Sequence, residues 1–153
     1  MDEAPATLHR RHDVSHLSTI LVAEDDLDLR DAVELILHRR GYHVVTTGDG
    51  LRAVELAEQH PVDVALVDLL MPGQSGFQVA TDLKARHGDA VRVIIMSGNA
   101  SAPHVDYAFA AGAERFLPKP FTTSQLLDTV AAFCPPPDDK PPSGSFRTAR
   151  IGS

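Results

Sequence analysis

Short apolar runs alternate with amphipathic stretches along most of this chain, and that alternation restricts its fold more than any other feature. The apolar runs are Thr19–Ala23, Tyr42–Thr46, Asp63–Val67, Arg92–Met96 and Arg115–Leu117. Their length and their content of β-branched residues are typical of strands that are buried on both faces. Parallel sheets bury their strands in this way, because the segments that connect parallel strands cross over the faces of the sheet. The runs therefore predict a parallel β-sheet.

An amphipathic stretch with the spacing of a helix follows each of the runs. The apolar faces comprise Leu29, Val33, Ile36 and Leu37; Ala53, Leu56 and Ala57; Phe77, Ala80 and Leu83; Val105, Ala108, Phe109 and Gly112; and Leu126, Leu127, Val130, Ala131 and Cys134. Gly41 is placed to close the first helix. Alternating strands and helices predict an α/β fold, which is a flavodoxin-like, doubly wound five-stranded parallel sheet in the order 2-1-3-4-5 with five helices.

Composition divides the 153 residues into one domain and two tails. Residues 1–17 are polar and lack periodicity, and residues 135–153 are dense in Pro, Gly and Ser. We expect both segments to be disordered tails of a domain that spans residues 18–134. The single cysteine, Cys134, excludes an internal disulfide bond and a multi-cysteine zinc site.

Charge and hydropathy narrow the class of partner. The formal net charge of -7 argues against a nucleic-acid-binding surface and is compatible with binding of a multivalent cation. No apolar run approaches the length of a membrane span, and the N-terminus lacks the apolar core of a secretion signal. We therefore expect a cytoplasmic protein that contacts neither a membrane nor nucleic acid.

Polar and charged residues stand where the predicted strands end. The first strand is followed by Glu24-Asp25-Asp26, the third by Asp68, the fourth by Ser97 and the fifth by Lys119-Pro120. The carboxyl ends of parallel strands share one edge of the sheet, so these side chains converge although they are distant in sequence. In a flavodoxin-like order, the first and third strands flank the point where ligands bind. The carboxylates are therefore expected to face each other at that point.

The expected cluster has a definite chemistry. Carboxylates at close range raise one another's pKa or recruit a cation. Hard oxygen ligands without His or Cys favour Mg²⁺, which binds carboxylates, waters and phosphate oxygens. Lys119 adds an ammonium group and Ser97 a hydroxyl, and both suit a phosphoryl group. Asp68, at a central strand end, is the carboxylate best positioned to accept that group as a covalent nucleophile.

Four segments in order, ILVAEDDLDLR, ALVDLLMPGQSGF, VIIMSGN and FLPKPF, resemble the response-regulator receiver family of two-component signalling. The resemblance covers residues 18–134. It implies that Asp68 is the phosphoacceptor. It also implies that Glu24, Asp25 and Asp68 hold Mg²⁺, together with the backbone carbonyl of Leu70, and that Mn²⁺ is an alternative ion.

The same resemblance assigns the remaining residues of the pocket. Ser97 is implied to be the switch hydroxyl, Lys119 the phosphate-binding lysine before a cis bond to Pro120, and Phe116 the aromatic switch residue. Asp26 is an outside candidate for the metal site. The implied phosphoryl donor is a sensor histidine kinase or a histidine phosphotransfer protein. An unknown protein effector is expected at the face formed by the fourth helix, the fifth strand and the fifth helix.

These implications lead us to expect a single-domain response regulator that accepts a phosphoryl group on Asp68 and then switches partner binding. It is not expected to be an enzyme beyond self-phosphotransfer and slow self-dephosphorylation. We expect no output domain after Cys134, so the effector is expected to be a separate protein unless the chain is a fragment. A phosphorelay shuttle, and a phosphorylation-independent interaction module on the same fold, stay open as alternatives.

Position 70 bears on how long a phosphoryl group would persist on Asp68. Aspartate-nucleophile phosphohydrolases generally carry a second Asp two residues after the nucleophile, and Leu70 in that place counts against this class. Leu70 also has no polar group to orient a hydrolytic water, whereas the side chain of Asn99 can orient one. We hypothesise a moderately long-lived phosphoryl-aspartate.

Overall fold

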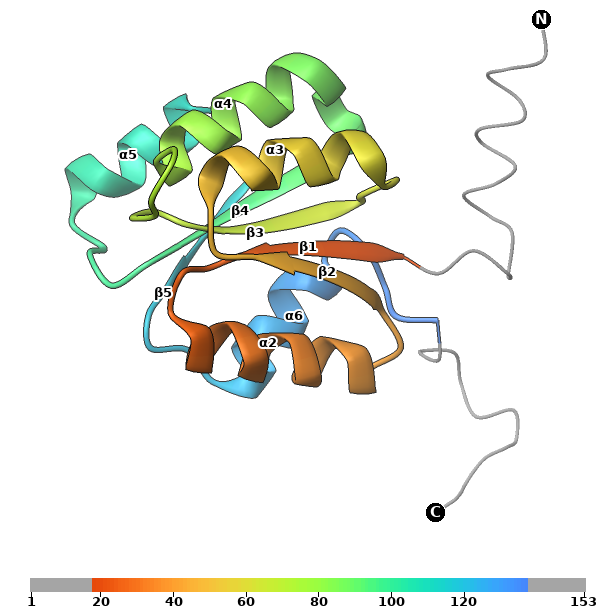
Figure 1. Cartoon of the computed structure of the whole chain (residues 1–153). Helices are drawn as coiled ribbons and strands as arrows, with labels where there is room; N and C mark the ends of the chain where they lie inside the picture. Colours follow the sequence, from red (N-terminus) through yellow and green to blue (C-terminus); the bar gives the residue numbers. More distant parts are fainter. Residues whose placement is uncertain (1–17, 138–153) are drawn as a thin grey trace, which may run out of the picture.

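The computed structural model describes residues 18–137, along which strands and helices alternate (Figure 1). The strands are β1 (Thr19–Ala23), β2 (His43–Thr47), β3 (Val64–Asp68), β4 (Arg92–Ser97) and β5 (Arg115–Pro118). The helices are α2 (Leu27–Arg39), α3 (Gly50–Gln59), α4 (Gly76–His87), α5 (Ala102–Ala110) and α6 (Thr123–Ala131), with a short 3-10 turn η1 (Gly88–Ala90) before β4. Within the described residues, the numbers of strands and α-helices are those predicted from the sequence.

The strands form one parallel sheet in the order β2-β1-β3-β4-β5, which confirms the predicted fold. Every residue of β1 and β3 is buried, as is all of β4 except its first residue. The outer strands β2 and β5 are partly exposed. Burial on both faces therefore holds for the central strands, whereas each outer strand has a neighbour on one side only.

Two apolar cores lie on opposite faces of the sheet, and Figure 1 shows helices covering both faces. Helices α2 and α6 cover one face, where Val33 and Leu126 belong to one cluster with the strand residue Leu66. Helices α3, α4 and α5 cover the other, where Val79 clusters with Ile95. Successive side chains of a strand point to opposite faces, so the central strands supply both cores. Packing from both sides holds the carboxyl ends of β1, β3 and β4 in line.

Helix α2 begins directly after the acidic residues that end β1. The Asp26 carboxylate accepts a hydrogen bond from Leu29 N at 3.2 Å and so caps the first turn. The Asp26 N–H in turn donates to Glu24 Oε2 at 3.1 Å. Gly41 follows the helix with a φ of 105°, as expected for the residue that closes it. The start of α2 therefore fixes the backbone on which Glu24 is placed.

The boundaries of four strands differ from the prediction by one residue, whereas β1 has the predicted bounds. β2 is His43–Thr47 rather than Tyr42–Thr46, β3 is Val64–Asp68 rather than Asp63–Val67, and β4 and β5 each extend one residue further. Tyr42 instead packs in the core, and its hydroxyl donates to the carbonyl of Cys134 at 2.6 Å. Asp63 receives a hydrogen bond from Thr19 N at 3.0 Å through its side chain. Long-range contacts of this kind are invisible to local periodicity.

The predicted apolar face of α5 is partly wrong. Ala108 is buried, but Phe109 is 47% exposed, and Val105 and Gly112 are partly exposed. Neighbouring positions on a helix point about 100° apart, so adjacent residues do not share one narrow face. The small Ala108 side chain belongs to the core cluster on this face of the sheet, and the larger Phe109 ring lies on the outside of the helix.

No helix within residues 18–137 is both long and apolar enough to cross a lipid bilayer. The segments predicted to be tails lie outside the described residues, except for residues 135–137. The domain boundaries at 18 and 134 stay predictions.

The turn between β3 and α4 brings the backbone close to the end of β3. Gly73 has a φ of 85°, which glycine adopts without strain. At Gly76 the constraint is space, because a Cβ there would contact the carbonyl oxygen of Asp68 and lie 2.8 Å from Leu69 Cα. This close approach holds the turn against the strand end that carries Asp68.

Gly76→Ala should lower the free energy of unfolding by roughly 1–3 kcal/mol, because the added methyl group overlaps backbone atoms. The better helix propensity of alanine offsets about 1 kcal/mol at most. Urea unfolding followed by circular dichroism measures the change. Gly98→Ala is the matched control, since a Cβ at Gly98 meets nothing within 4 Å. Equal free energies of unfolding for the two variants would contradict the close-approach explanation.

Candidate functional site

The carboxyl ends of the strands surround a cavity of about 520 Å³. Its walls are formed by residues 24–26 after β1, 68–70 at and after β3, and 97–99 at and after β4, together with His104 and Lys119. The convergence predicted from the strand ends is therefore present in the structure. Segments far apart in sequence meet here because every strand of a parallel sheet points the same way.

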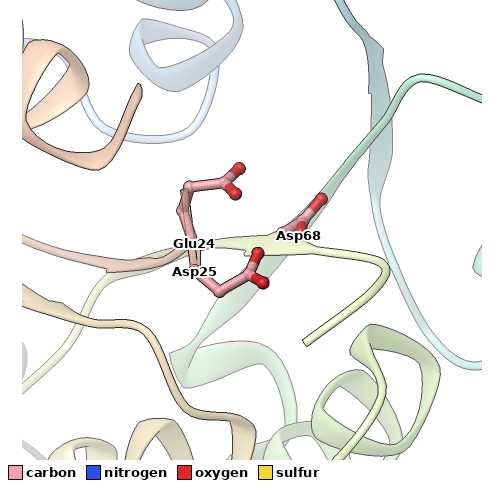
Figure 2. Close-up of side chains that lie close together, drawn as sticks. All are labelled: Glu24, Asp25 and Asp68. Carbon is pink, nitrogen blue, oxygen red and sulfur yellow. The ribbon is translucent and has the colours of Figure 1, made fainter. Parts of the chain in front are cut away.

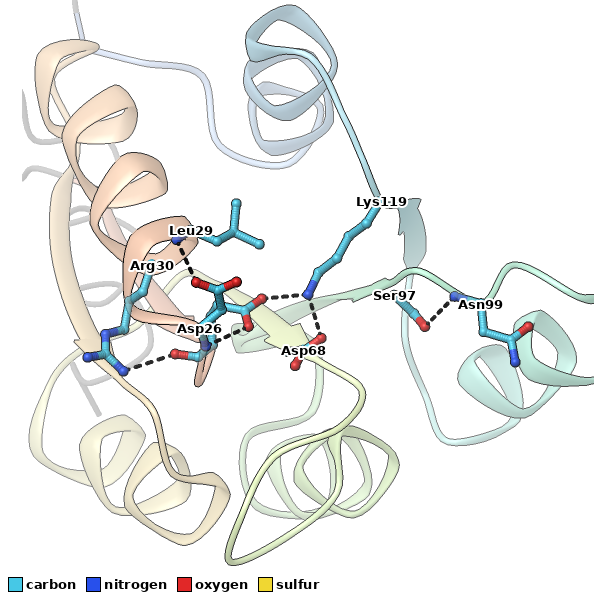
Figure 3. Close-up of polar contacts among 8 residues, drawn as sticks. Asp26, Leu29, Arg30, Asp68, Ser97, Asn99 and Lys119 are labelled. Carbon is cyan, nitrogen blue, oxygen red and sulfur yellow. Dashed lines mark hydrogen bonds and ion pairs between the residues drawn. The ribbon is translucent and has the colours of Figure 1, made fainter.

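The Lys119 side chain joins two carboxylates across the cavity. Lys119 Nζ lies 2.7 Å from Glu24 Oε1 and 2.8 Å from Asp68 Oδ1 (Figure 3). The backbone helps to place it, because Lys119 N donates to the carbonyl of Ser97 at 2.8 Å. The peptide bond from Lys119 to Pro120 is cis, as expected from the sequence. The ammonium group therefore sits between the ends of β1 and β3.

Three carboxylates come together at the same edge. Glu24, Asp25 and Asp68 each place an oxygen within 4.8 Å of the others, and Figure 2 shows the three groups gathered around one space. Glu24 and Asp68 are buried, at 1% and 6% exposure, while Asp25 is exposed. The cluster thus has an inner pair, bonded to Lys119, and an outer acid that faces solvent.

Burial disfavours the ionised forms of the inner pair. It raises the pKa of Asp68 above the ordinary value, although the hydrogen bond from Lys119 opposes the shift. Burial likewise raises the pKa of Glu24, again against the hydrogen bond from Lys119. For Lys119, burial alone would lower the pKa, but the hydrogen bonds to Asp68 and Glu24 outweigh burial and raise it. The ammonium form of Lys119 is therefore the form that this edge favours.

The donor set fits a divalent hard cation. Three carboxylates face a single ammonium group, so negative charge is in excess when all of the groups are ionised. All of the clustered donors are carboxylate oxygens, which Mg²⁺ prefers over nitrogen or sulfur donors. The exposed position of Asp25 also leaves room for the water ligands that Mg²⁺ usually keeps.

Ser97 and Phe116 occupy different positions relative to the cavity. Ser97 is buried in the wall, and its Oγ accepts a hydrogen bond from Asn99 N at 3.0 Å (Figure 3). Phe116 is partly buried on β5 and packs against the core on the side of α3 and α4. It is paired in register with Ile95 of β4, two residues before Ser97.

Asp26 and Leu70, both named from the sequence, line the cavity, and among the lining residues that were not named His104 has a polar side chain. Asp26 lines the cavity but its carboxylate caps α2, and it is not part of the three-carboxylate cluster. Leu70 lines the cavity with a side chain that is 76% exposed. His104, in the first turn of α5, lines the cavity and was not identified from the sequence. A single histidine at the start of a helix carries no motif; only its spacing from Ser101 hints at a contact.

Together, these features define a class of protein: a doubly wound domain with a lysine-bridged acidic cavity at the carboxyl edge of its sheet. Residues 20–131 match the family described as "Response regulator receiver domain". The chain therefore belongs to the response regulator receiver family of two-component signalling. Receiver domains are phosphoacceptor signalling domains rather than enzymes in the ordinary sense, and they bind Mg²⁺ at an acidic pocket.

Curated relatives and solved structures agree with this family. The transcriptional activator protein PfeR of Pseudomonas aeruginosa is 34% identical over 116 residues, which are 73% of this chain and 37% of PfeR. The chemotaxis protein CheY4 of Vibrio cholerae superposes with a TM-score of 0.73 at 26% identity, over 77% of this chain and 99% of that one. The response regulator TrrA of Thermotoga maritima was solved in complex with Mg²⁺ and BeF. It superposes with a TM-score of 0.69 at 24% identity, over 76% of this chain and 99% of that one. At this low identity, the likeness to TrrA shows the fold alone.

The chain spans about half or less of the length of the curated relatives that it matches. What is shared with them is the receiver domain.

The pKa shifts predict how stability depends on pH. A carboxyl whose pKa is raised by folding stabilises the fold below its ordinary pKa, here 3.8 for Asp68, and that contribution is lost as the pH rises through the raised value. Asp68→Asn removes this titration. Without divalent metal, the wild type should therefore lose stability relative to Asp68→Asn as the pH rises from about 3 to about 7. The free energy of unfolding of Asp68→Asn minus that of the wild type should increase over this range.

Urea unfolding across this pH range, in the presence of a chelator, measures that difference. Asp106→Asn, at an exposed position of α5, is the charge-matched control. A difference for Asp68→Asn that stays constant or shrinks as the pH rises would contradict the raised pKa.

Proposed function

We propose that this receiver domain accepts a phosphoryl group on Asp68 from a histidine kinase or a histidine phosphotransfer protein, in a Mg²⁺-dependent reaction, and thereby switches its binding of a separate protein. The observation that carries the proposal is the bridge from Lys119 Nζ to Asp68 and Glu24, at 2.8 and 2.7 Å, inside the cavity. The cytoplasm is the proposed location.

Asp68 is the proposed nucleophile. One of its carboxylate oxygens forms the new bond to phosphorus while the bond from phosphorus to the donor imidazole nitrogen breaks. The bonding electron pair leaves with that nitrogen, which takes a proton from solvent. Lys119, already within hydrogen-bonding distance of Asp68, would compensate charge on the transferred phosphoryl oxygens. The reaction needs little from the protein beyond positioning and charge compensation, to which Asp68 and Lys119 both contribute.

Glu24, Asp25 and Asp68 are the proposed side-chain ligands of Mg²⁺, with the backbone carbonyl of Leu70 as a further ligand and Mn²⁺ as an alternative ion. When bound, the metal neutralises negative charge on phosphoryl oxygens. The carboxylate cluster supports this assignment because its oxygens already lie within 4.8 Å of one another. TrrA, which has the same fold, was solved in complex with Mg²⁺ and BeF, and this also supports the assignment.

Ser97 and Phe116 are the proposed switch. A phosphoryl group on Asp68 would offer Ser97 Oγ an acceptor, and Ser97 would then move from its present bond with Asn99 N. That movement would vacate space beside β4, into which the Phe116 ring can rotate. The proposed docking face for the effector is formed by α5, β5 and α6, which are the fourth helix, fifth strand and fifth helix predicted from the sequence. Tyr107 and Phe109 of α5, at 66% and 47% exposure, offer apolar area on that helix.

The alternatives differ in what becomes of the phosphoryl group. A phosphorelay shuttle would pass it on to a second histidine, and an interaction module would bind its partner without it. Slow self-dephosphorylation, rather than turnover on small substrates, is proposed because Leu70 offers no acid or amide at the cavity mouth.

Incubation with Mg²⁺ and a small acyl-phosphate donor should add one phosphoryl group to the wild-type chain, as measured by intact mass. Asp68→Asn should abolish the added mass, because it removes the nucleophile, and a chelator should suppress it. Asp26→Asn is the matched control, since Asn also caps helices, and it should keep the modification. An unmodified wild-type chain would favour the interaction module, and steady phosphate release over many turnovers would favour a hydrolase.

Mg²⁺ should raise the melting temperature of the wild type, because a ligand that binds only the folded state stabilises it. Asp25→Asn should weaken the Mg²⁺ affinity by at least about tenfold through loss of a ligand. Asp26→Asn should weaken it much less, since that carboxylate caps α2. Melting temperatures over a Mg²⁺ titration give both affinities. Equal losses in the two variants would argue against the assignment of Asp25 as a ligand.

A further inference from the structure

A network of three polar side chains lies on one wall of the cavity, and the proposed transfer reaction makes no use of it. Asn99 and His104 line the cavity, and Ser101 stands between them in sequence. Asn99 Nδ2 lies 3.4 Å from His104 Nε2, and Ser101 Oγ lies 3.0 Å from His104 Nδ1. The Ser101 N–H donates to Asn99 Oδ1 at 3.1 Å. Both ends of the Asn99 amide are therefore engaged.

One imidazole tautomer satisfies the whole network. The amide nitrogen of Asn99 can only donate, so Nε2 of His104 accepts, and the ring proton is then on Nδ1, which donates to the Ser101 hydroxyl. Ser101 is the N-cap of α5, and its side chain makes no bond to the amides of its own helix. The Ser101 hydroxyl contacts His104 instead. The imidazole ring is therefore bonded to Ser101 through Nδ1 and to the Asn99 amide through Nε2.

The network keeps the Asn99 amide at a distance from the phosphoacceptor. In Figure 3 the amide lies on the side of Ser97 that is remote from Asp68. Loss of a phosphoryl group by hydrolysis requires a water in line with the bond that breaks, and a polar side chain near that position accelerates the attack by orienting the water. Leu70 has no polar group that could orient this water. If the Asn99 amide were released from the network, it could orient the water from the cavity wall instead.

We propose that His104 is a positioning residue which, with Ser101, holds the Asn99 amide away from Asp68 and so prolongs the life of phosphoryl-Asp68. The inference rests on the proposed function of Asp68. In the hydrolysis that it slows, a water oxygen forms a bond to phosphorus while the bond from phosphorus to the Asp68 oxygen breaks. The Asp68 carboxylate is regenerated, and the water protons pass to inorganic phosphate and solvent.

His104→Leu tests the proposal, because leucine keeps the bulk of the side chain but cannot accept a hydrogen bond. The chain is phosphorylated with Mg²⁺ and an acyl-phosphate donor, the donor is removed, and the loss of the phosphoryl group is followed by intact mass. The lifetime should fall by about three- to tenfold, which is the scale of one hydrogen bond. Asp106→Ala, an exposed change on the same helix, is the control and should leave the lifetime unchanged.

A double variant separates positioning of Asn99 from a general effect on the helix. If His104 acts through Asn99, the chain with Asn99→Ala and His104→Leu should lose phosphate at the same rate as Asn99→Ala alone, because no amide is left to release. The proposal is overturned if His104→Leu has an unchanged or longer lifetime. It is also overturned if His104→Leu shortens the lifetime equally in the absence of the Asn99 amide.

A second measurement needs no phosphoryl group. Asn99 is the only asparagine of the chain, so ¹⁵N-asparagine labelling gives one side-chain nitrogen resonance, correlated with the two protons of its NH₂ group. Its heteronuclear NOE should indicate a rigid group in the wild type and a mobile one in His104→Leu. Equal mobility in the two chains would overturn the role of His104 and leave the proposal for Asp68 intact. A wild-type chain that takes up no phosphoryl group would refute the function proposed for Asp68, while the NOE would still decide whether His104 restrains Asn99.

Discussion

One partly buried ammonium group organises the acidic edge of this sheet. Lys119 Nζ bonds Glu24 and Asp68, whose carboxyls lie 95 and 51 residues away in sequence and are almost wholly buried. Ionised carboxylates removed from water are strongly disfavoured unless they are paired and hydrogen-bonded. Burial raises the pKa values of Glu24 and Asp68 despite the hydrogen bonds from Lys119, so one ammonium group compensates the two carboxylates only in part. The edge is therefore electrostatically incomplete, and a further cation would relieve it.

The position of Lys119 is itself a product of the sheet. β5 pairs with β4, and the register places Ser97 opposite Pro118 at the ends of the two strands. Lys119 is the residue that directly follows this pair. The hydrogen bond from Lys119 N to the Ser97 carbonyl continues this pairing by one step. The charged side chain can then reach past β4 to the end of β3. Strand register, rather than any local feature of the lysine, brings the ammonium group to the acids.

Topology and most of the acidic site could be predicted from the sequence, because both follow from where apolar runs end. Once strands alternate with helices, Asp68 and Lys119 must share an edge, whatever their separation along the chain. Phe109 was misplaced because helical spacing alone does not say which of two adjacent apolar residues faces the sheet. His104 was missed because its significance depends on the path of the loop after β4, which places it near Asn99.

Ser97 links the wall of the cavity that carries Lys119 to the wall that carries Asn99 and His104. Its carbonyl accepts from Lys119 N, and its Oγ accepts from Asn99 N. If Ser97 Oγ turns to a phosphoryl oxygen, as proposed, Asn99 loses the bond that ties its backbone to the strand end. The side-chain bonds to Ser101 and His104 then become the remaining restraint on Asn99. On these proposals, phosphorylation of Asp68 would therefore also be the step after which the hydrogen bonds of His104 and Ser101 govern the lifetime of phosphoryl-Asp68.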